Sequence, residues 1–283
     1  MFDAMLENEP VLRLSFFLGI FGVVALWETA APRRDRTLPR WTRWPSNLGI
    51  AALNTVMLRF LFPLAAVGMA ISVSANDWGL FNLFELPFWL EVILAVALLD
   101  AAVYLQHVIF HAVPALWKLH RMHHADLDYD VTTGARFHPV EIILSMLIKL
   151  SVVSILGASP MAVIIFEVLL SATAMFNHGN IRLPLGIDGA LRLFIVTPDM
   201  HRVHHSIIPG EANSNFGFSL PWWDHLFGTY RAQPEAGHEG MTIGINAFRE
   251  PIEQRLDNML MQPLKGGARG YAINDLGKSN TDK

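Results

Sequence analysis

The sequence predicts an all-α membrane protein: about four to five transmembrane or membrane-embedded helices that carry a cytosolic, histidine-rich helical cap. Apolar residues make up 52% of the 283 residues and charged residues only 16%, with a mean hydropathy of +0.35. Soluble domains average about a quarter charged residues. The apolar residues fall into five long stretches, and eleven of the twelve histidines lie between His107 and His225. These features together indicate membrane helices joined to one compact polar centre.

The five apolar stretches are the candidate membrane helices. They cover residues 11–31, 46–75, 89–106, 139–156 and 160–176. The hydrocarbon core of a bilayer is ~30 Å thick and needs ~20 helical residues, so the first two stretches suffice and the last three are marginal. The marginal stretches also contain charged residues, Lys149 and Glu167 among them. We favour membrane helices whose charged groups face the bundle interior or an interface; buried helices of a soluble bundle are the alternative.

Arginine placement predicts the orientation in the membrane. The loop after the first stretch holds Arg33, Arg34, Arg36, Arg40 and Arg43, whereas residues 76–88 contain no Lys or Arg. By the positive-inside rule that loop is cytosolic and the N-terminus lies outside. The second stretch then crosses outward, the third returns, and the fourth and fifth form a hairpin that also returns. Every histidine group therefore lies on the cytosolic side at one membrane depth. Because the chain is compact and shows no targeting signal, we expect a bacterial inner membrane.

Nine histidines are candidate metal ligands. His107 and His111 are four residues apart, which places both imidazoles on one face of a helix, ~6 Å apart at Cβ. Two His-x-x-His-His boxes follow at residues 120–124 and 201–205. Within a box the first histidine shares a face with the other two, but the two adjacent histidines point ~100° apart, so one box can serve two metal ions. His178 follows the fifth stretch and returns to the same membrane depth.

Three further histidines have weaker patterns. His138 precedes Pro139 at the start of the fourth stretch and could be a ligand or could orient one. We favour the orienting role, with Glu141 and Asp100 as further partners of ligand imidazoles. His225 and His238 are interpreted as structural or surface residues.

The lack of cysteine narrows the metal chemistry. It excludes disulfides, zinc-thiolate sites, iron–sulfur clusters and thiolate-ligated haem bound by this chain. Eight or nine imidazoles exceed what one tetrahedral ion takes, so two ions are implied. Imidazole suits zinc, copper, iron and nickel alike. Neither the His-Glu-x-x-His protease pattern nor the Glu-x-x-His helices of soluble di-iron bundles occur. A nitrogen-rich two-metal site at a membrane surface favours oxygen chemistry on an alkyl chain, where water must be excluded.

The motifs, in this order, resemble the fatty acid hydroxylase superfamily, which includes sterol desaturases and C4-methylsterol oxidases. The similarity runs from about Asp100 to Tyr230 and includes the sequences RFHP at 136–139 and WDHLFGTY at 223–230. It implies a non-haem di-iron enzyme that hydroxylates or desaturates a lipid or sterol-like substrate with O2, with zinc as a possible metal in isolated protein. The ligands that the resemblance implies are His107, His111, His120, His123, His124, His201, His204 and His205, with His178 as the ninth. Arg182 stands where fatty acyl hydroxylases have a further histidine, so the sterol-desaturase-like branch is the closer match.

The sequence also predicts a domain organisation and the electron-donor proteins that the enzyme would need. Residues 1–100 would hold the first three membrane helices and the arginine-rich loop. Residues 101–230 would form the catalytic domain, including a membrane hairpin at 139–177, and residues 231–283 a polar C-terminal tail. No fused cytochrome b5-like segment is visible, so electrons would come from a separate ferredoxin or cytochrome b5-like protein with its reductase. The net charge of −4 does not suggest nucleic acid.

Two other functions stay open from the sequence. A di-zinc membrane hydrolase would need a carboxylate base, which Glu141, Asp126 or Asp199 could supply. A divalent-metal transporter would need ligands at mid-membrane on a translocation path, whereas these histidines fall at helix ends, and Lys149 and Arg59 would repel cations. The substrate is equally open, because sterol, carotenoid, fatty acyl and ether-lipid chains all fit.

Overall fold

The computed structural model describes residues 8–84 and 86–275, and this part of the chain is helical, with two isolated β-bridges and no strand. Residues 1–7, residue 85 and residues 276–283, which include the N-terminal segment and the end of the expected tail, lie outside the described residues. Five segments are long and apolar enough to cross a membrane: Pro10–Ala30, Arg40–Leu83, Phe88–Ala112, Pro139–Leu156 and Pro160–Asn177. The predicted all-α membrane fold is therefore confirmed.

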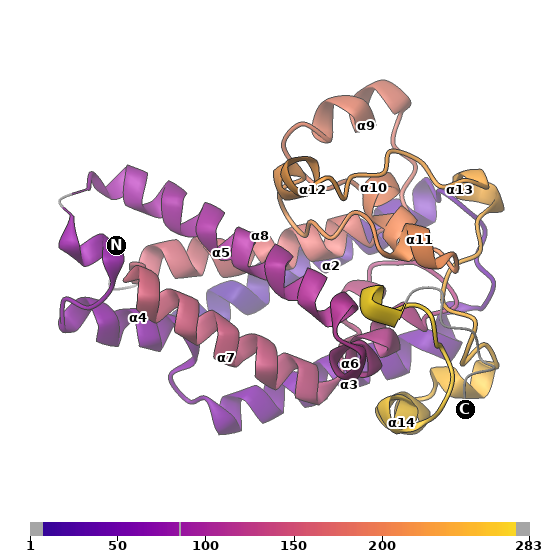
Figure 1. Cartoon of the computed structure of the whole chain (residues 1–283), viewed down its shortest axis with the longest axis horizontal. Coiled ribbons are helices and arrows are strands. Elements are labelled where there is room, and N and C mark those ends of the chain that lie inside the picture. Colours follow the sequence, from indigo (N-terminus) through magenta and orange to yellow (C-terminus); the bar gives the residue numbers. More distant parts are fainter. Residues whose placement is uncertain (1–7, 85, 276–283) are drawn as a thin grey trace.

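The membrane helices form an elongated bundle with the cap at one end (Figure 1). The bundle includes α2 (Glu9–Ala30), α5 (Phe88–Ala112), α7 (Pro139–Leu156) and α8 (Pro160–Asn177). Helix α8 packs against α2, α5 and the short helix α4 (Ala65–Ala75). Proline begins both α7 and α8, where its missing N–H is not needed. Gly157 makes the turn between these two helices with φ +70°, a conformation that glycine adopts without steric cost. The hairpin thus starts and ends at the cap.

The second apolar stretch is two helices rather than one. Helix α3 (Arg40–Leu61) and helix α4 (Ala65–Ala75) are separated at Phe62, whose backbone has φ −129° and ψ +73°. The cause is Pro63, which has no N–H to donate and disfavours a helical conformation in the residue before it. Helix α3 also starts six residues earlier than the apolar stretch, because polar residues of its first turns, Arg43 and Asn47, are buried in the cap.

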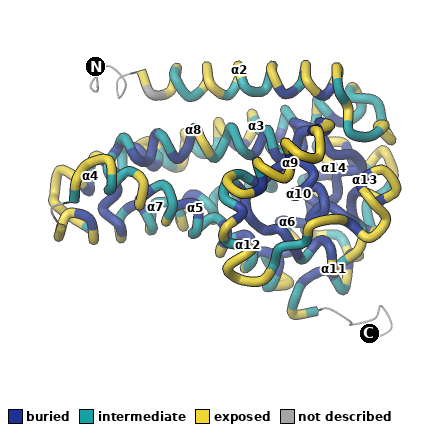
Figure 2. The backbone as a smooth tube through the Cα atoms, turned by 90° about the horizontal axis from the view of Figure 1, so that it is seen from above, coloured by how far each residue is buried: buried dark blue, intermediate teal, exposed yellow. Residues whose placement is uncertain are grey.

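The cap gathers short segments at the end of the bundle where α2 and α5 end. These segments are α6 (Pro114–His124), η2 (Thr133–Ala135), α9 (Leu185–Leu191), α10 (Pro198–His204), α11 (Pro209–Ala212), α12 (Trp222–Phe227), α13 (Gly237–Gly240), η3 (Pro251–Gln254), α14 (Leu256–Met261), η4 (Gln262–Leu264) and η5 (Ile273–Asp275). Figure 2 shows buried residues concentrated in the cap, while the membrane helices are largely intermediate and exposed, with buried residues along α8. The bundle's exposed side chains are largely apolar, as a lipid-facing surface requires.

A buried ion network joins α3 to the loop before α7. The Arg43 side chain is fully buried and donates to both carboxylate oxygens of Asp126 and, at 2.8 Å, to Asp130. Arg136 is likewise buried and donates to the Met122 carbonyl and to Asn47. Buried charges of this kind are stable only when they are paired and fully hydrogen-bonded. The network therefore fixes the loop that follows the first histidine box.

The segment expected to be a polar tail packs on the cap as far as the structure describes it. Arg121, next to two of the histidines, donates to the carbonyls of Gln262, Lys265 and Gly267. Tyr271 stacks on Trp117 with ring centroids 5.7 Å apart. Buried carbonyls that receive a guanidinium give this segment a defined path. Because these contacts join residues about 140 positions apart, no local sequence pattern predicts them.

Candidate metal centre

The nine candidate histidines converge in two adjacent groups, both buried in the cap. Group A consists of His107, His111, His120, His124 and His204; group B consists of His123, His178, His201 and His205. Within each group, one nitrogen from every imidazole lies within 4.8 Å of the others. The groups touch, because the His123 and His124 rings are 5.4 Å apart and the His204 and His205 rings 5.5 Å. The expectation that all histidine motifs meet at one end of the bundle is therefore met.

Helical spacing divides the boxes between the groups. In the first box, His120 and His124 are one turn apart and enter group A, while His123 points to group B. In the second box the division is reversed: His201 and His205 enter group B, and His204 enters group A. Residues four apart share a helix face and adjacent residues point ~100° apart. Each box therefore bridges the two groups, as its spacing predicts.

The hydrogen bonds of the imidazoles determine which ring nitrogen is free. Five rings use Nδ1–H to donate to an oxygen: His107 to the Phe216 carbonyl, His111 to Asn213 Oδ1, His120 to Glu141, His178 to the Ala174 carbonyl and His204 to the Ser214 carbonyl. A carbonyl or carboxylate oxygen can only accept, so in the neutral ring Nε2 carries the lone pair. This outer hydrogen bond is the usual way in which a protein orients a metal-binding histidine.

Ring nitrogens from different helices approach one another closely, and in one pair no donor lies between them. The Nε2 atoms of His107 and His120 are 3.1 Å apart, and both rings donate through Nδ1. The Nε2 atoms of His111 and His124 are 3.1 Å apart, and those of His123 and His178 are 3.2 Å apart. Two ligand nitrogens ~2.1 Å from one ion lie ~3.0–3.4 Å apart. The facing lone pairs of His107 and His120 repel unless a cation lies between them. The Nε2 atoms of His123 and His178 are at a similar separation, so the spacing of the donors fits one metal ion in each group.

Further buried nitrogens have no protein partner. Both ring nitrogens of His201 and His205, together with Nε2 of His204, are fully buried and make no hydrogen bond to protein. An unsatisfied buried polar atom costs ~1–3 kcal/mol, and the described part of the cap has several of them in one place. A bound cation in each group would give these nitrogens the partner that the protein lacks.

Burial keeps these imidazoles in the neutral form that a metal requires. Desolvation, followed by repulsion from neighbouring rings, holds the pKa values of His123, His124, His201, His204 and His205 well below their ordinary range. Burial likewise lowers the pKa of His178 to about 4. Metal binding requires the deprotonated ring. The cluster is therefore ready to accept cations at neutral pH.

Glu141 holds one ligand candidate in place. Its Oε1 accepts the Nδ1–H of His120 at 2.6 Å, and both side chains are buried. We expect Glu141→Gln to lower metal affinity about 10- to 100-fold, because a neutral amide is a weaker acceptor and imidazole basicity falls with it. Metal content after dialysis against graded chelator measures this. Glu239→Gln is the matched control, since it changes an exposed carboxylate outside both groups. Unchanged metal retention in Glu141→Gln would contradict the assigned role.

Asp100 and His138, which were also expected to orient ligand imidazoles, have other hydrogen-bond partners. Asp100 accepts from the Leu220 amide and the Trp223 indole, so it anchors the loop after residue 216 and not an imidazole. His138 caps α7, accepting from the Val140 amide and donating to the Leu260 carbonyl at 3.3 Å. Neither residue is brought to a ligand ring, because each is held by backbone groups of its own neighbourhood.

The remaining histidines and acids lie outside the two groups. His225 stacks on Tyr230 at the exposed helix α12, whereas His238 is buried, 3.5 Å from Asp199. Asp199 is paired with Arg202 and Arg33, and Asp126 is paired with Arg43. A carboxylate held by a guanidinium is a poor base because ionisation is already favoured.

His238 gives the cap a measurable response to acid. Burial lowers the pKa of His238 from 6.5 to about 4, against the opposing effect of Asp199. Below about pH 6.5 the unfolded chain gains a proton that the folded cap does not accept, so stability falls until about pH 4. His238→Gln should therefore lose less of its thermal midpoint than the wild type between pH 7 and pH 4. An equal fall of the thermal midpoint in His238→Gln and in the wild type would show that His238 does not cause the loss of stability in acid.

Several positions that shape the site carried no signal of their own in the sequence. Asn213 accepts from His111, and the Phe216 and Ser214 carbonyls accept from His107 and His204. Asp224 accepts from the Phe216 and Gly217 amides, which sets the path of this loop. Asp224 lies in the WDHLFGTY segment that carries the family resemblance; its role in holding the acceptor for His107 depends on the tertiary fold.

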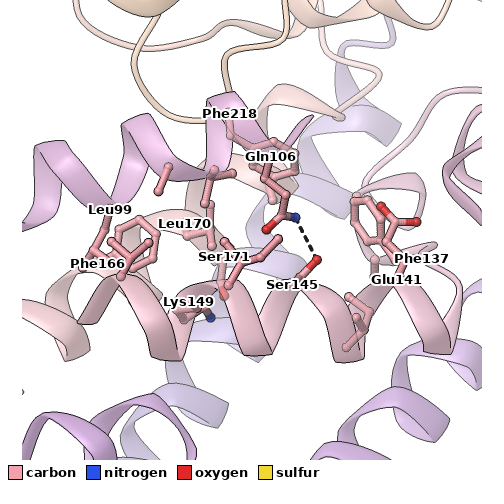
Figure 3. A pocket seen from close by; sticks show the side chains of 18 of the residues that line it. Leu99, Gln106, Phe137, Glu141, Ser145, Lys149, Phe166, Leu170, Ser171 and Phe218 are labelled. Atoms are coloured by element: carbon pink, nitrogen blue, oxygen red, sulfur yellow. Dashed lines mark hydrogen bonds between the residues drawn. The ribbon is translucent and has the colours of Figure 1, made fainter. Parts of the chain in front are cut away.

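An apolar cavity of about 300 Å³ lies inside the bundle among α5, α7 and α8. Its walls include Leu99, Val103, Phe166 and Leu170, and its cap end is formed by Phe137, Glu141 and Phe218 (Figure 3). A smaller void of about 30 Å³ shares that cap end and lies against His107 and His120 of group A. Such a void exceeds the ~10–15 Å³ that one water molecule needs. An alkyl chain in the cavity would thus end beside group A.

The comparisons with known proteins agree with this arrangement. Residues 92–229 match the family model described as Fatty acid hydroxylase. The chain is 28% identical over 177 residues to an ornithine lipid hydroxylase of Rhizobium tropici, covering 61% of this chain and 51% of that protein. It is 30% identical over 194 residues to the alkylglycerol monooxygenase of Homo sapiens, covering 64% and 40%. It is 22% identical over 147 residues to the cholesterol 25-hydroxylase of Rattus norvegicus, covering 52% and 48%.

The chain spans about half the length of the curated relatives it matches. No solved structure matches it significantly. The matched region begins within α5, ends just after α12 and contains both histidine groups. Residues 92–229 of this chain are therefore a fatty acid hydroxylase domain.

Proposed function

We propose that this protein is an integral membrane, non-haem di-iron oxygenase that hydroxylates or desaturates a lipid or sterol-like substrate with O2 and external electrons. The observation that carries the proposal is the pair of buried, all-imidazole donor groups at the end of an apolar cavity. The family match supports it, as do the relatives, whose names describe lipid and sterol hydroxylases and monooxygenases.

The proposed ligands follow the two groups. His107, His111, His120, His124 and His204 would hold one iron ion, and His123, His178, His201 and His205 the other. Imidazole also binds zinc readily, so zinc could occupy the same donors in isolated protein. Two iron ions would supply the chemistry that activates O2. In hydroxylation, one oxygen atom is inserted into a C–H bond, and the other is reduced to water with two external electrons and two protons.

The protein's own contribution is orientation and exclusion of water. Glu141 and the Phe216 carbonyl fix the rings of His120 and His107, which face the small void. Phe137 and Phe218 form the apolar wall on the substrate side of that void. An apolar wall keeps bulk water from a strong oxidant and holds a chain close to it.

The two rival functions have weaker support. For a di-zinc hydrolase, Asp126 and Asp199 are held by guanidinium groups and Glu141 is held by His120. For a metal transporter, the ligand candidates are buried at one end of the bundle and not on a path through it. The observed cavity is lined by apolar side chains, which suits a hydrocarbon chain and not a hydrated cation.

The setting of the reaction is part of the proposal. The arginine-rich loop lies in the cap with the histidines, where Arg33 pairs with Asp199 and Glu239. By the positive-inside rule this end would face the cytosol of a bacterial inner membrane. A separate ferredoxin or cytochrome b5-like protein would deliver electrons to the cap. Residues 101–230, including the hairpin at 139–177, would form the catalytic domain.

Lipid mass spectrometry of cells with and without the chain tests the proposed function. Addition of one oxygen atom to a lipid identifies hydroxylation, and loss of two hydrogen atoms identifies desaturation. His123→Ala serves as the inactive control because it removes one of the four imidazoles of group B. Anaerobic purification followed by metal analysis identifies the ions. If no lipid class changes, or if the protein holds only zinc and consumes no O2, the proposal is wrong.

A further inference from the structure

The apolar cavity contains one polar pair that the metal centre does not use. The Gln106 amide donates to the Ser145 hydroxyl at 2.8 Å, linking α5 to α7 across the cavity. Figure 3 shows this pair between Phe218 on one side and Ser171 on the other, with Glu141 toward the cap and Lys149 and Phe166 toward the membrane end. A chain that reaches the small void must therefore pass Gln106 and Ser145.

Gln106 lies where the two spaces meet. It lines both the large cavity and the small void that touches His107 and His120. It immediately precedes His107 in α5, and Ser145 follows Glu141 by one helical turn in α7. The pair is thus less than two helical turns from the residues that orient group A, where a substrate would be oxidised.

The hydrogen-bonding capacity of the pair is only partly used. A glutamine side chain offers two N–H donors and one acceptor oxygen, and a serine hydroxyl offers a donor as well. Within the described residues, the side chain of Gln106 makes one protein hydrogen bond and that of Ser145 makes the same one. Placing such groups in an apolar cavity is costly unless a partner arrives.

The geometry points to Gln106 and Ser145 as a specificity-determining site for an oxygen atom in the substrate chain. This assignment rests on the proposed lipid oxygenase function, and it narrows the substrate class to chains with an ether or ester oxygen close to the carbon that is oxidised. The pair binds that oxygen through the free N–H or O–H groups. A purely hydrocarbon chain leaves these donors unpaired and binds less well.

The test compares three lipids that share a terminal 1,2-diol and differ only in the link between that diol and the long chain. Purified protein in lipid nanodiscs is titrated with 1-O-hexadecylglycerol, with monopalmitoylglycerol and with icosane-1,2-diol, in which a methylene replaces the ether oxygen. Native mass spectrometry measures equilibrium binding without any requirement for turnover. We expect the wild type to bind an oxygen-bearing probe about five- to tenfold more tightly than the all-carbon diol, as one hydrogen bond predicts. Which of the two oxygen probes binds better separates an ether from an ester.

Variants separate recognition from a purely structural link between helices. Gln106→Met and Ser145→Ala should lose the discrimination while binding the all-carbon diol as the wild type does. Leu105→Met and Ser151→Ala, at exposed positions on the same two helices, should keep it. Equal binding of all three probes by the wild type, no binding of any probe, or retained discrimination in Gln106→Met would overturn the assignment. Because binding is read without turnover, these results are independent of a failure to detect oxygenation.

Discussion

Replacing His205 by Ala is expected to remove the ion of group B, while replacing His124 by Ala should weaken the ion of group A less. Group B offers four imidazoles and group A five, so the loss leaves three donors in one case and four in the other. Loss of an orienting partner alone costs about 10- to 100-fold in metal affinity, and loss of a ligand costs at least that much. We expect lipid oxidation to fall at least ~100-fold in both variants, because the chemistry depends on the bound ions.

These two positions suit the experiment because neither Nδ1 makes a hydrogen bond to the protein. Each replacement therefore removes a nitrogen donor without breaking an outer contact. Elemental analysis after dialysis against chelator gives metal per chain, and lipid mass spectrometry gives activity. His225→Ala is the matched control, since its exposed ring stacks on Tyr230 outside both groups. Wild-type metal content in both His124→Ala and His205→Ala would show that these nitrogens do not hold metal.

Arg43→Met is expected to destabilise the protein strongly. It would leave the buried carboxylates of Asp126 and Asp130 without their guanidinium. Burial opposes ionisation of Asp126, but Arg43 outweighs it and holds the pKa of that carboxyl well below its usual range. Breaking such a buried pair costs ~3–5 kcal/mol, so we expect a clearly lower thermal midpoint and less bound metal.

Tryptophan fluorescence during heating in detergent measures this loss. Arg43→Lys should be intermediate, because an ammonium keeps the charge but cannot bind both oxygens of Asp126 as the guanidinium does. Arg36→Met is the control, since Arg36 is an exposed arginine of the same loop region. If Arg43→Met melts together with the wild type, the ion network contributes little and the loop after the first box must be held by other contacts.

The histidine spacings were enough to predict two groups, but not their membership. Helical periodicity separates His123 from His120 and His124, and the structure keeps that separation. The assignment of His204 to the group of His107, and of His123 to that of His178, joins residues from different helices. It depends on how α5, α6, α8 and α10 pack, which no local pattern encodes.

Charged residues were harder to interpret than histidines. Asp100, Glu141 and His138 were expected to orient imidazoles, and of the three only Glu141 accepts a hydrogen bond from one, that of His120. Asp100 and His138 instead bind backbone and indole groups near them. A carboxylate or imidazole accepts any donor within reach, so its partner is decided by which backbone segment passes at ~3 Å.

By itself, the sequence determined the membrane class, the bounds of α7 and α8 to within one residue and the nine histidines that converge. Hydrophobic length and the helical repeat act over a few turns of one segment, so they can be read from the sequence. Only the tertiary structure decided which imidazoles share a group, how the cavity reaches them and how residues 231–275 close the cap. Those features arise from contacts between distant segments, such as Arg121 with Gly267 and His107 with Phe216. Their geometry is fixed by packing and buried hydrogen bonds, which exist only after the chain has folded.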